Sequence, residues 1–215
     1  MTKDIVSILK SVGAVLTDDH FVYTSGKHGS VYINKDTLYT HPVETSGVGK
    51  MFAEKFKNSH IDVVVAPAIG GTILSQWTAY WLSRLTKSDV RSCYTEKDKG
   101  TSAGASESEQ IFRRGYDKLV KGKRVLVLED LTTTGLSVKK VVDVVGAHGG
   151  TVIAVAVMVN RDPKHVSSRF VGAPFFALGV LLADAYDEAA CPLCKKGTAI
   201  NTTVGHGKQF LAGRI

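Results

Sequence analysis

The stretch RVLVLEDLTTTGLSVKKVVDVV, residues 124–145, decides the fold because it predicts a buried strand, a turn and a helix in direct succession. Residues 125–128 are all apolar and half of them are β-branched, which is typical of an interior strand in a parallel sheet. Val138, Val141, Val142 and Val145 recur at helical spacing, and glycines end the helix directly afterwards. Strand, turn and helix in this order predict an α/β fold with a parallel sheet.

Two acids and a hydroxyl-rich turn stand between the predicted strand and helix. Glu129 and Asp130 are expected at the carboxyl end of the strand, where open α/β sheets bind ligands. In residues 131–137, hydroxyls and a glycine precede a helix, whose N-terminal N–H groups can hold an anion. Neither a nucleoside-triphosphate loop, G-x-x-x-x-G-K-[ST], nor a dinucleotide fingerprint, G-x-G-x-x-G, occurs here. Carboxylates accept hydrogen bonds from vicinal hydroxyls, so the stretch predicts a ligand with both a phosphate and a sugar diol.

This pattern resembles the diphosphoribosyl-binding signature of type I phosphoribosyltransferases: four apolar residues, two acids, two loosely fixed positions, then Thr and Gly. The resemblance implies an α/β fold with a Rossmann-like parallel sheet flanked by helices, and a small N-terminal hood. It implies that Glu129 and Asp130 act in catalysis by binding the ribose hydroxyls. The phosphoribosyl diphosphate site that it implies consists of Lys97, Lys99, Glu129, Asp130, Leu131, Thr132, Thr133, Thr134, Gly135, Leu136 and Ser137.

A second strand, glycine turn and helix is predicted from residues 63–85. Val63, Val64, Val65 and Ala66 form the strand, and an apolar helix is expected over 73–85. A glycine turn at a strand end lets backbone N–H groups approach an anion closely. In the resembled family the equivalent loop holds pyrophosphate, which implies that role for Ala68, Ile69, Gly70, Gly71 and Thr72.

The N-terminal region predicts a helix over 3–12 and then two short strands, 21–23 and 31–33, around a turn at 24–30. This region is similar to the hood that covers the base in orotate phosphoribosyltransferases. Arg161 follows a predicted buried strand, 151–159, and is a candidate bidentate partner for a carboxylate or carbonyl pair. The base-binding residues implied are Ser25, Gly26, Lys27, Thr133 and Arg161.

Small and polar residues fill positions 100–110, after a predicted strand at 90–94, and predict a long loop. In orotate phosphoribosyltransferases a basic loop here closes over the site and brings lysines to the leaving pyrophosphate. The resemblance therefore implies a catalytic Lys97, with Lys99 beside it. Where the family carries further cations, this chain has Thr24, Gly70 and Glu96.

Composition predicts one globular domain, because 215 residues with 44% hydrophobic content can bury a large core. We expect an N-terminal helix and hood at 1–40, a phosphoribosyltransferase core at 41–174 and a C-terminal extension with the Cys191 and Cys194 pair at 175–215. The net charge of +7 indicates an anionic partner. Basic residues alternate with acids and no block of five like charges occurs, which favours local phosphate sites over nucleic acid.

Other features predict a cytoplasmic protein without a membrane partner. The apolar stretch at 174–183 is far shorter than the roughly 20 residues of a membrane helix. The N-terminus lacks the pattern of a signal peptide, and three cysteines are too few for a disulfide scaffold. Cys191 and Cys194 have the spacing of two zinc ligands, but a structural zinc needs four. His206, Cys93 or a second subunit could complete the set, and two buried reduced thiols are the alternative.

The resemblance implies a Mg²⁺-dependent homodimer that joins orotate to phosphoribosyl diphosphate, giving orotidine 5′-monophosphate and pyrophosphate. One alternative is a phosphoribosyltransferase for another base, a purine or uracil. Another is a non-catalytic regulator that senses phosphoribosyl diphosphate and binds nucleic acid, which the charge of +7 permits.

Overall fold

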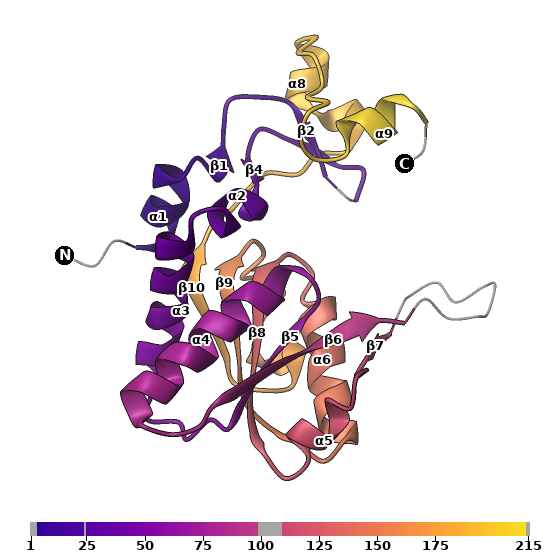
Figure 1. Ribbon diagram of the computed structural model, residues 1–215. Helices are drawn as coiled ribbons and strands as arrows, with labels where there is room; N and C mark the ends of the chain where they lie inside the picture. Colours follow the sequence, from indigo (N-terminus) through magenta and orange to yellow (C-terminus); the bar gives the residue numbers. More distant parts are fainter. Residues whose placement is uncertain (1–3, 24, 99–108, 214–215) are drawn as a thin grey trace.

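The computed structural model describes residues 4–23, 25–98 and 109–213. Within them a six-stranded sheet has the order β10-β9-β8-β5-β6-β7, parallel except for β7 (Figure 1). The strands are β1 (Val15–Leu16), β2 (Phe21–Val22), β3 (His28–Gly29), β4 (Tyr32–Ile33), β5 (Val63–Pro67), β6 (Arg91–Lys97), β7 (Gln110–Ile111), β8 (Arg124–Thr132), β9 (Thr151–Asn160) and β10 (Phe175–Val180). The helices are α1 (Ile5–Ser11), α2 (Lys35–Tyr39), α3 (Pro42–Phe56), α4 (Gly70–Thr86), α5 (Asp117–Val120), α6 (Leu136–Ala147), α7 (Ser168–Val171), a 3₁₀ turn at Glu188–Ala190, α8 (Pro192–Lys195) and α9 (Gly207–Leu211).

Alternating side chains of β8 build a separate core on each face of the sheet. Leu126 and Leu128 pack with the apolar residues of α3 and α4, such as Phe52. Val125 and Val127 point to the other face, where α6 contributes Val138, Val141 and Val145. This period-2 alternation gives three layers, helices on both sides of a sheet, as predicted for the fold class.

Three predicted elements are longer than their apolar patterns. β8 continues through both acids to Thr132, because its ladder with β9 runs on to the pair Thr132 and Asn160. β6 extends to Lys97, and α4 begins at Gly70 rather than at residue 73. The polar ends of β8 and β6 and the glycines that begin α4 therefore lie at the edge of the sheet that carries the ligand site.

The hood differs from its prediction in strand pairing. Phe21–Val22 pairs with His28–Gly29, inside the segment expected to be the turn, and Tyr32–Ile33 pairs with Val15–Leu16. A Cβ on Gly29 would clash with the Tyr23 hydroxyl and the backbone of Asp184, so glycine permits this close packing. The hood is thus two short antiparallel ladders instead of one hairpin.

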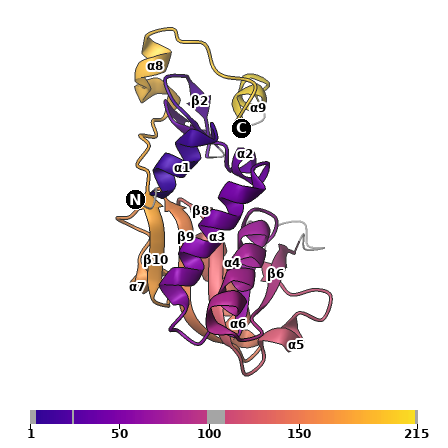
Figure 2. The same cartoon turned by 60° about the vertical axis from the view of Figure 1, so that its left-hand side comes forward.

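The C-terminal segment packs on the hood at one end of the sheet (Figures 1 and 2). Tyr186 forms a reciprocal backbone pair with His28, and the Asn201 N–H donates to the His20 carbonyl at 2.8 Å. We expected the extension to begin at residue 175, whereas β10 is an edge strand of the main sheet. Within the expected extension, it is the described residues after β10 that lie outside that sheet.

The predicted loop at 100–110 falls mostly outside the described residues, as does Lys99. Its last residue, Gln110, begins β7, which pairs antiparallel with the end of β6. None of the described helices combines the length and the apolarity needed to cross a membrane.

Candidate functional site

Two adjoining cavities open at the carboxyl ends of the central strands. The larger, of about 660 Å³, lies between the turn after β8 and the hood. The smaller, of about 250 Å³, lies over the loop after β5. Glu129, Leu131 and Ser137 line both cavities and so mark their junction. The volume of the larger cavity suits a small-molecule ligand.

Both acids are buried: Glu129 lies at this junction, and Asp130 lies beside it and lines the smaller cavity. Glu129 is 8% exposed and Asp130 is 2% exposed. Glu129 accepts a hydrogen bond from the Asp130 N–H at 3.0 Å, and Asp130 accepts one from the Leu131 N–H at 2.6 Å. Burial, reinforced by the neighbouring Asp130 charge, raises the pKa of Glu129 well above its usual range. Buried carboxylates that line a cavity are typical of a functional site.

Lys35 supplies a cation at the acid pair that the sequence did not indicate. Its Nζ lies 2.7 Å from Asp130 Oδ2, and it lines the smaller cavity. Burial alone would lower the pKa of Lys35, but Asp130 outweighs it and raises the pKa. Tyr39 donates to the Gly70 carbonyl at 2.6 Å and lies 3.1 Å from Asp130 Oδ2. A lysine and a tyrosine from α2 therefore hold Asp130 in place.

Glycine at position 70 leaves room for the contact between Asp130 and Lys35. A Cβ on Gly70 would clash with the Asp130 carboxylate and with Lys35 Nζ. A lysine at this position, where the resembled family carries a cation, would displace the ion pair. In this chain the cation beside the loop comes from Lys35 instead.

The turn after β8 forms the wall of the larger cavity. Thr132, Thr133, Thr134, Gly135 and Ser137 line it. Gly135 adopts a φ of 75°, which glycine accommodates without strain, and its N–H donates to Thr132 Oγ1 at 3.0 Å. The first residue of α6 follows at once, so hydroxyls and helix N–H groups face one space, as an anion site requires.

The far end of the larger cavity combines hood, β9 and C-terminal residues. Arg161 lines it and stacks its guanidinium 4.7 Å from the centre of the Tyr23 ring. Ser25 and Lys27 line it from the hood, and Ala183 contributes from the segment after β10. Tyr23 was absent from the predicted base-binding set, because an aromatic residue at the end of a predicted strand is as typical of the hydrophobic core as of a ligand site.

Most of the predicted residues line a cavity, and several do not. Ala68, Ile69, Gly70 and Lys97 line the smaller cavity, together with Gln110, which was not predicted. The predicted residues that line neither cavity are Gly26, Gly71, Thr72 and Leu136, and Lys99 lies outside the described residues. Gly71 is needed for packing, because a Cβ there would press on Ala66 and on the Leu128 carbonyl. Leu136 turns outward and is 41% exposed.

Comparison with known proteins identifies the family. Residues 34–171 match the phosphoribosyl transferase domain. The chain belongs to the phosphoribosyltransferase family. Orotate phosphoribosyltransferase of Caldanaerobacter subterraneus subsp. tengcongensis is 37% identical over 183 residues, covering 85% of this chain and 87% of that protein. The orotate phosphoribosyltransferase of Thermotoga maritima is 36% identical over 194 residues, and the match covers 90% of this chain and 93% of the Thermotoga maritima protein.

Solved phosphoribosyltransferases share the fold. The crystal structure of orotate phosphoribosyltransferase from Aeropyrum pernix superposes with a TM-score of 0.60 at 26% identity, covering 82% of this chain and 93% of the other. The predicted resemblance to this family and the predicted fold class are therefore confirmed. The chain is a pentosyl-transferring enzyme of this family, and its two cavities meet where the family's sugar phosphate signature lies in the sequence.

Proposed function

We propose that this phosphoribosyltransferase joins orotate to phosphoribosyl diphosphate. The C1′–O bond to the diphosphate breaks, a bond forms between C1′ and a ring nitrogen of orotate, and that nitrogen loses its proton. The products are orotidine 5′-monophosphate and pyrophosphate. The single observation that carries this proposal is the junction of two cavities at Glu129, one against the threonine turn and the other over the glycine loop.

The acid pair would bind the ribose between the two cavities. Vicinal hydroxyls are hydrogen-bond donors, and Glu129 and Asp130 supply carboxylate acceptors. Negative charge beside the sugar also stabilises positive charge that develops at C1′ as the bond to the diphosphate breaks. The hydroxyls and N–H groups of residues 132–137 would hold the 5′-phosphate in the larger cavity.

The smaller cavity suits the diphosphate because cations and backbone amides meet there. Lys35 and Lys97 line it, with Ala68, Ile69 and Gly70 of the loop after β5. Lysines and amides that are already in place stabilise the negative charge that collects on the departing group. Lys99 stays a predicted contributor, and Gly71 and Thr72 would help only by shaping the loop.

The base would lie against the hood in the larger cavity. Orotate carries a carboxylate beside carbonyl groups, and the planar fork of Arg161 can bind such a pair with two hydrogen bonds. Lys27 adds a second positive charge, and Ser25 a hydroxyl, from the hood. Thr133 stays a proposed base contact, since it lines the same cavity.

Mg²⁺, which the family resemblance implies, fits the oxygen donors at the junction. This ion is usually held by one or two carboxylates together with substrate phosphates. The diphosphate of the substrate would supply most of its ligands, with Glu129 as the neighbouring carboxylate, because both Asp130 oxygens already have partners. The ion would supply positive charge to the leaving group. Activity should vanish with a chelator and return on addition of MgCl₂.

A direct assay tests this function. The purified chain is mixed with MgCl₂, phosphoribosyl diphosphate and orotate, and pyrophosphate release and orotidine monophosphate are measured. We expect both products in equal amounts. Parallel reactions with uracil, adenine and guanine decide the base, because the fold itself hosts several specificities. Faster turnover with one of these bases would overturn orotate as the substrate, and no turnover with any would overturn the enzymatic function.

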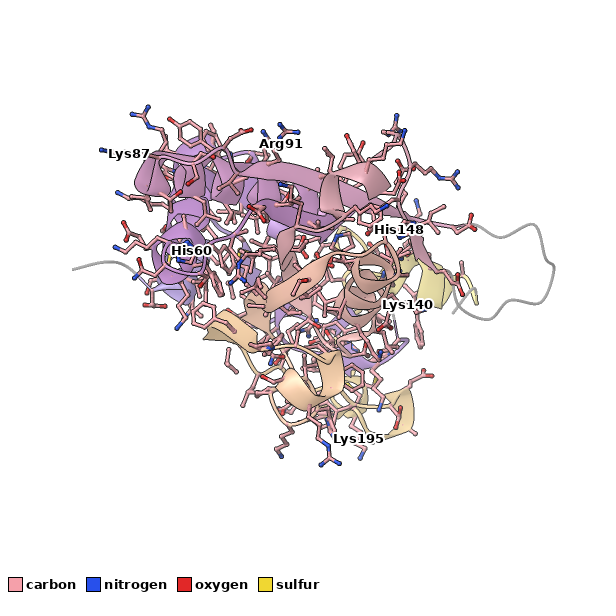
Figure 3. All side chains as sticks on the ribbon, turned by 90° about the horizontal axis from the view of Figure 1, so that it is seen from below. His60, Lys87, Arg91, Lys140, His148 and Lys195 are labelled. Carbon is pink, nitrogen blue, oxygen red and sulfur yellow. The ribbon has the colours of Figure 1, made fainter. Side chains whose placement is uncertain are left out.

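We also propose a small-molecule rather than a nucleic-acid partner. In Figure 3 Lys87 and Arg91 lie along the upper edge, Lys140 lies at the right and Lys195 at the bottom, whereas nucleic-acid binders present a continuous basic stripe. Filter binding to RNA and DNA at increasing salt tests this, since a true binder loses affinity steeply as salt rises.

A homodimer in the cytoplasm completes the proposal. Ile73 is 37% exposed and Tyr80 is 47% exposed on α4, which offers an apolar surface for a second copy. None of the three cysteines, all of which lie in the described residues, forms a disulfide, which fits a reducing compartment. Light scattering after size-exclusion chromatography measures the oligomer, and a monomer at working concentration would contradict the dimer.

A further inference from the structure

Four side chains from the two ends of the chain meet between the hood and the C-terminal segment. They are His20 and His28 of the hood with Cys191 and Cys194 of the C-terminal segment, and one ligand atom from each lies within 4.8 Å of the others. His28 and Cys194 are 166 positions apart in the sequence. We infer that these four residues form a structural zinc site that holds the hood to the C-terminal segment.

The spacing of the ligand atoms matches a tetrahedral site. His20 Nε2 lies 3.7 Å from both sulfurs, and His28 Nδ1 lies 3.4 Å from Cys194 Sγ. Zn–N bonds of about 2.0 Å and Zn–S bonds of about 2.3 Å place nitrogen and sulfur about 3.6 Å apart at tetrahedral angles. The two ring nitrogens are 2.8 Å apart and need to separate by about 0.5 Å to bind one ion.

The surroundings orient the histidine ligands toward this centre. His20 Nδ1 lies 2.8 Å from the Thr198 carbonyl oxygen, so this nitrogen carries the proton and Nε2 presents its lone pair to the cluster. A backbone carbonyl behind a ligating imidazole is the usual outer partner of a metal-bound histidine. His28 is fully buried and faces the cluster with Nδ1, whereas its other ring nitrogen, Nε2, has no hydrogen-bond partner among the described residues.

The hood needs such a link because it has little apolar core of its own. Neither of the two hydrophobic clusters among the described residues includes any residue from 16–32 or from 182–213. The strands of the hood are two residues long. A small unit of this kind commonly relies on a metal or on disulfides for stability, because the apolar area that it buries is small.

The ligand set selects zinc and a structural role. Two sulfurs and two imidazole nitrogens in a tetrahedron are characteristic of Zn²⁺, whereas Mg²⁺ and Ca²⁺ prefer oxygen. All four positions come from protein side chains, so no position is open for water or substrate. Cys93, which we had considered as a ligand, lies on β6 within the core instead, and the cluster does not include His206.

The site would also brace the loop that we propose for the base. His20 and His28 flank residues 21–27, which include the cavity-lining Ser25 and Lys27. This consequence rests on the proposed function, whereas the metal site does not. Loss of zinc should therefore raise the KM for orotate more than the KM for phosphoribosyl diphosphate.

Metal content and cobalt substitution test the site directly. The full chain, expressed with zinc in the medium and dialysed, should contain about one zinc ion per chain by mass spectrometry of the metal. After zinc removal, CoCl₂ should produce intense visible bands of tetrahedral cobalt and a thiolate charge-transfer band. ZnCl₂ should then displace the cobalt. If the zinc-free protein shows none of these bands after CoCl₂ is added, the inference is overturned.

Variants separate this site from casual binding. Cys194→Ser should lose the zinc, while two controls should keep it. Cys93→Ala removes a thiol from β6, and His148→Gln removes an imidazole that lies well away from Lys195, the neighbour of Cys194 (Figure 3). Equal zinc in Cys194→Ser and the wild type would mean an adventitious ion only, and a disulfide between Cys191 and Cys194 in freshly purified protein would equally refute the site. If Cys194→Ser fails to fold, the cobalt spectrum of the wild-type chain decides.

Discussion

Replacing Glu129 with glutamine should stabilise the ligand-free protein while abolishing its turnover. Burial and Asp130 raise the pKa of Glu129 above 4.5, the ordinary value of a glutamate. The folded state therefore holds this proton more tightly than the unfolded state does. Between 4.5 and the raised pKa, the free energy of unfolding of the wild type falls by about 1.4 kcal/mol per pH unit because of this one group. Above the raised pKa the effect is constant.

Glutamine cannot ionise, so the variant escapes this loss. It has nearly the shape of a protonated glutamate, and its carbonyl can still accept the Asp130 N–H that Glu129 accepts at 3.0 Å. The two proteins should thus have similar stability below pH 4.5 and should diverge as the pH rises. Turnover should disappear because the amide cannot supply the negative charge beside the ribose.

Urea unfolding of both proteins at a series of pH values measures this divergence. Asp143→Asn is the matched control, since Asp143 is an exposed acid on α6 that forms an ion pair with Lys139 four residues earlier. It should change stability by no more than about 0.5 kcal/mol at any pH. A stability difference between Glu129→Gln and the wild type that stays constant with pH would refute the assigned environment of Glu129.

Three further variants test the neighbouring contacts. Lys35→Met leaves the Asp130 carboxylate without the cation that lies 2.7 Å away. Since the Lys35 side chain is 33% exposed, we expect the free energy of unfolding in urea to fall by about 1–2 kcal/mol and turnover to slow. The control Lys57→Met, in the exposed pair with Glu54, should lower it by no more than about 0.5 kcal/mol. Gly70→Ala places a methyl group against Lys35 and Asp130, so it should lower the free energy of unfolding by about 1–3 kcal/mol and raise the KM for phosphoribosyl diphosphate. The control Gly47→Ala on α3, where a Cβ meets nothing within 4 Å, should raise the free energy of unfolding by about 0.5–1 kcal/mol. Equal effects of the two changes would contradict the packing at Gly70. Arg161→Lys loses the planar guanidinium and its stack on the Tyr23 ring. Steady-state kinetics should therefore show a KM for orotate raised roughly tenfold and an unchanged KM for phosphoribosyl diphosphate. An unchanged KM for orotate would remove Arg161 from the base site.

The core of the fold could be predicted because its signals are local. The apolar run at 125–128, the acids after it and the valine spacing of α6 each depend on neighbouring residues, and the structure contains the strand and the helix. Their ends were less predictable. β8 passes through Glu129 and Asp130 because its partner β9 continues beside it, and that partner is remote in the sequence.

Contacts between distant segments account for what the sequence did not indicate. Lys35 lies on a short helix far from Asp130 in the chain, and a lone lysine in a polar stretch carries no pattern. The two-residue strands of the hood are too short for an alternation to specify their partners. The Cys191 and Cys194 pair was recognisable in the sequence. Its histidine neighbours, His20 and His28, come from the hood, whereas the candidates named from the sequence were His206, Cys93 and a second subunit.

The union of the hood with the C-terminal segment also sets an order for folding during synthesis. His20 contacts the carbonyl of a residue that the ribosome adds 178 positions later. Every strand of the main sheet precedes that residue in the sequence, so the strands that carry the sugar phosphate cradle are synthesised before the partner of the hood. The hood is translated among the first segments and is completed among the last, and a chain truncated before Cys191 would contain every strand of the main sheet but lack two of the four proposed zinc ligands.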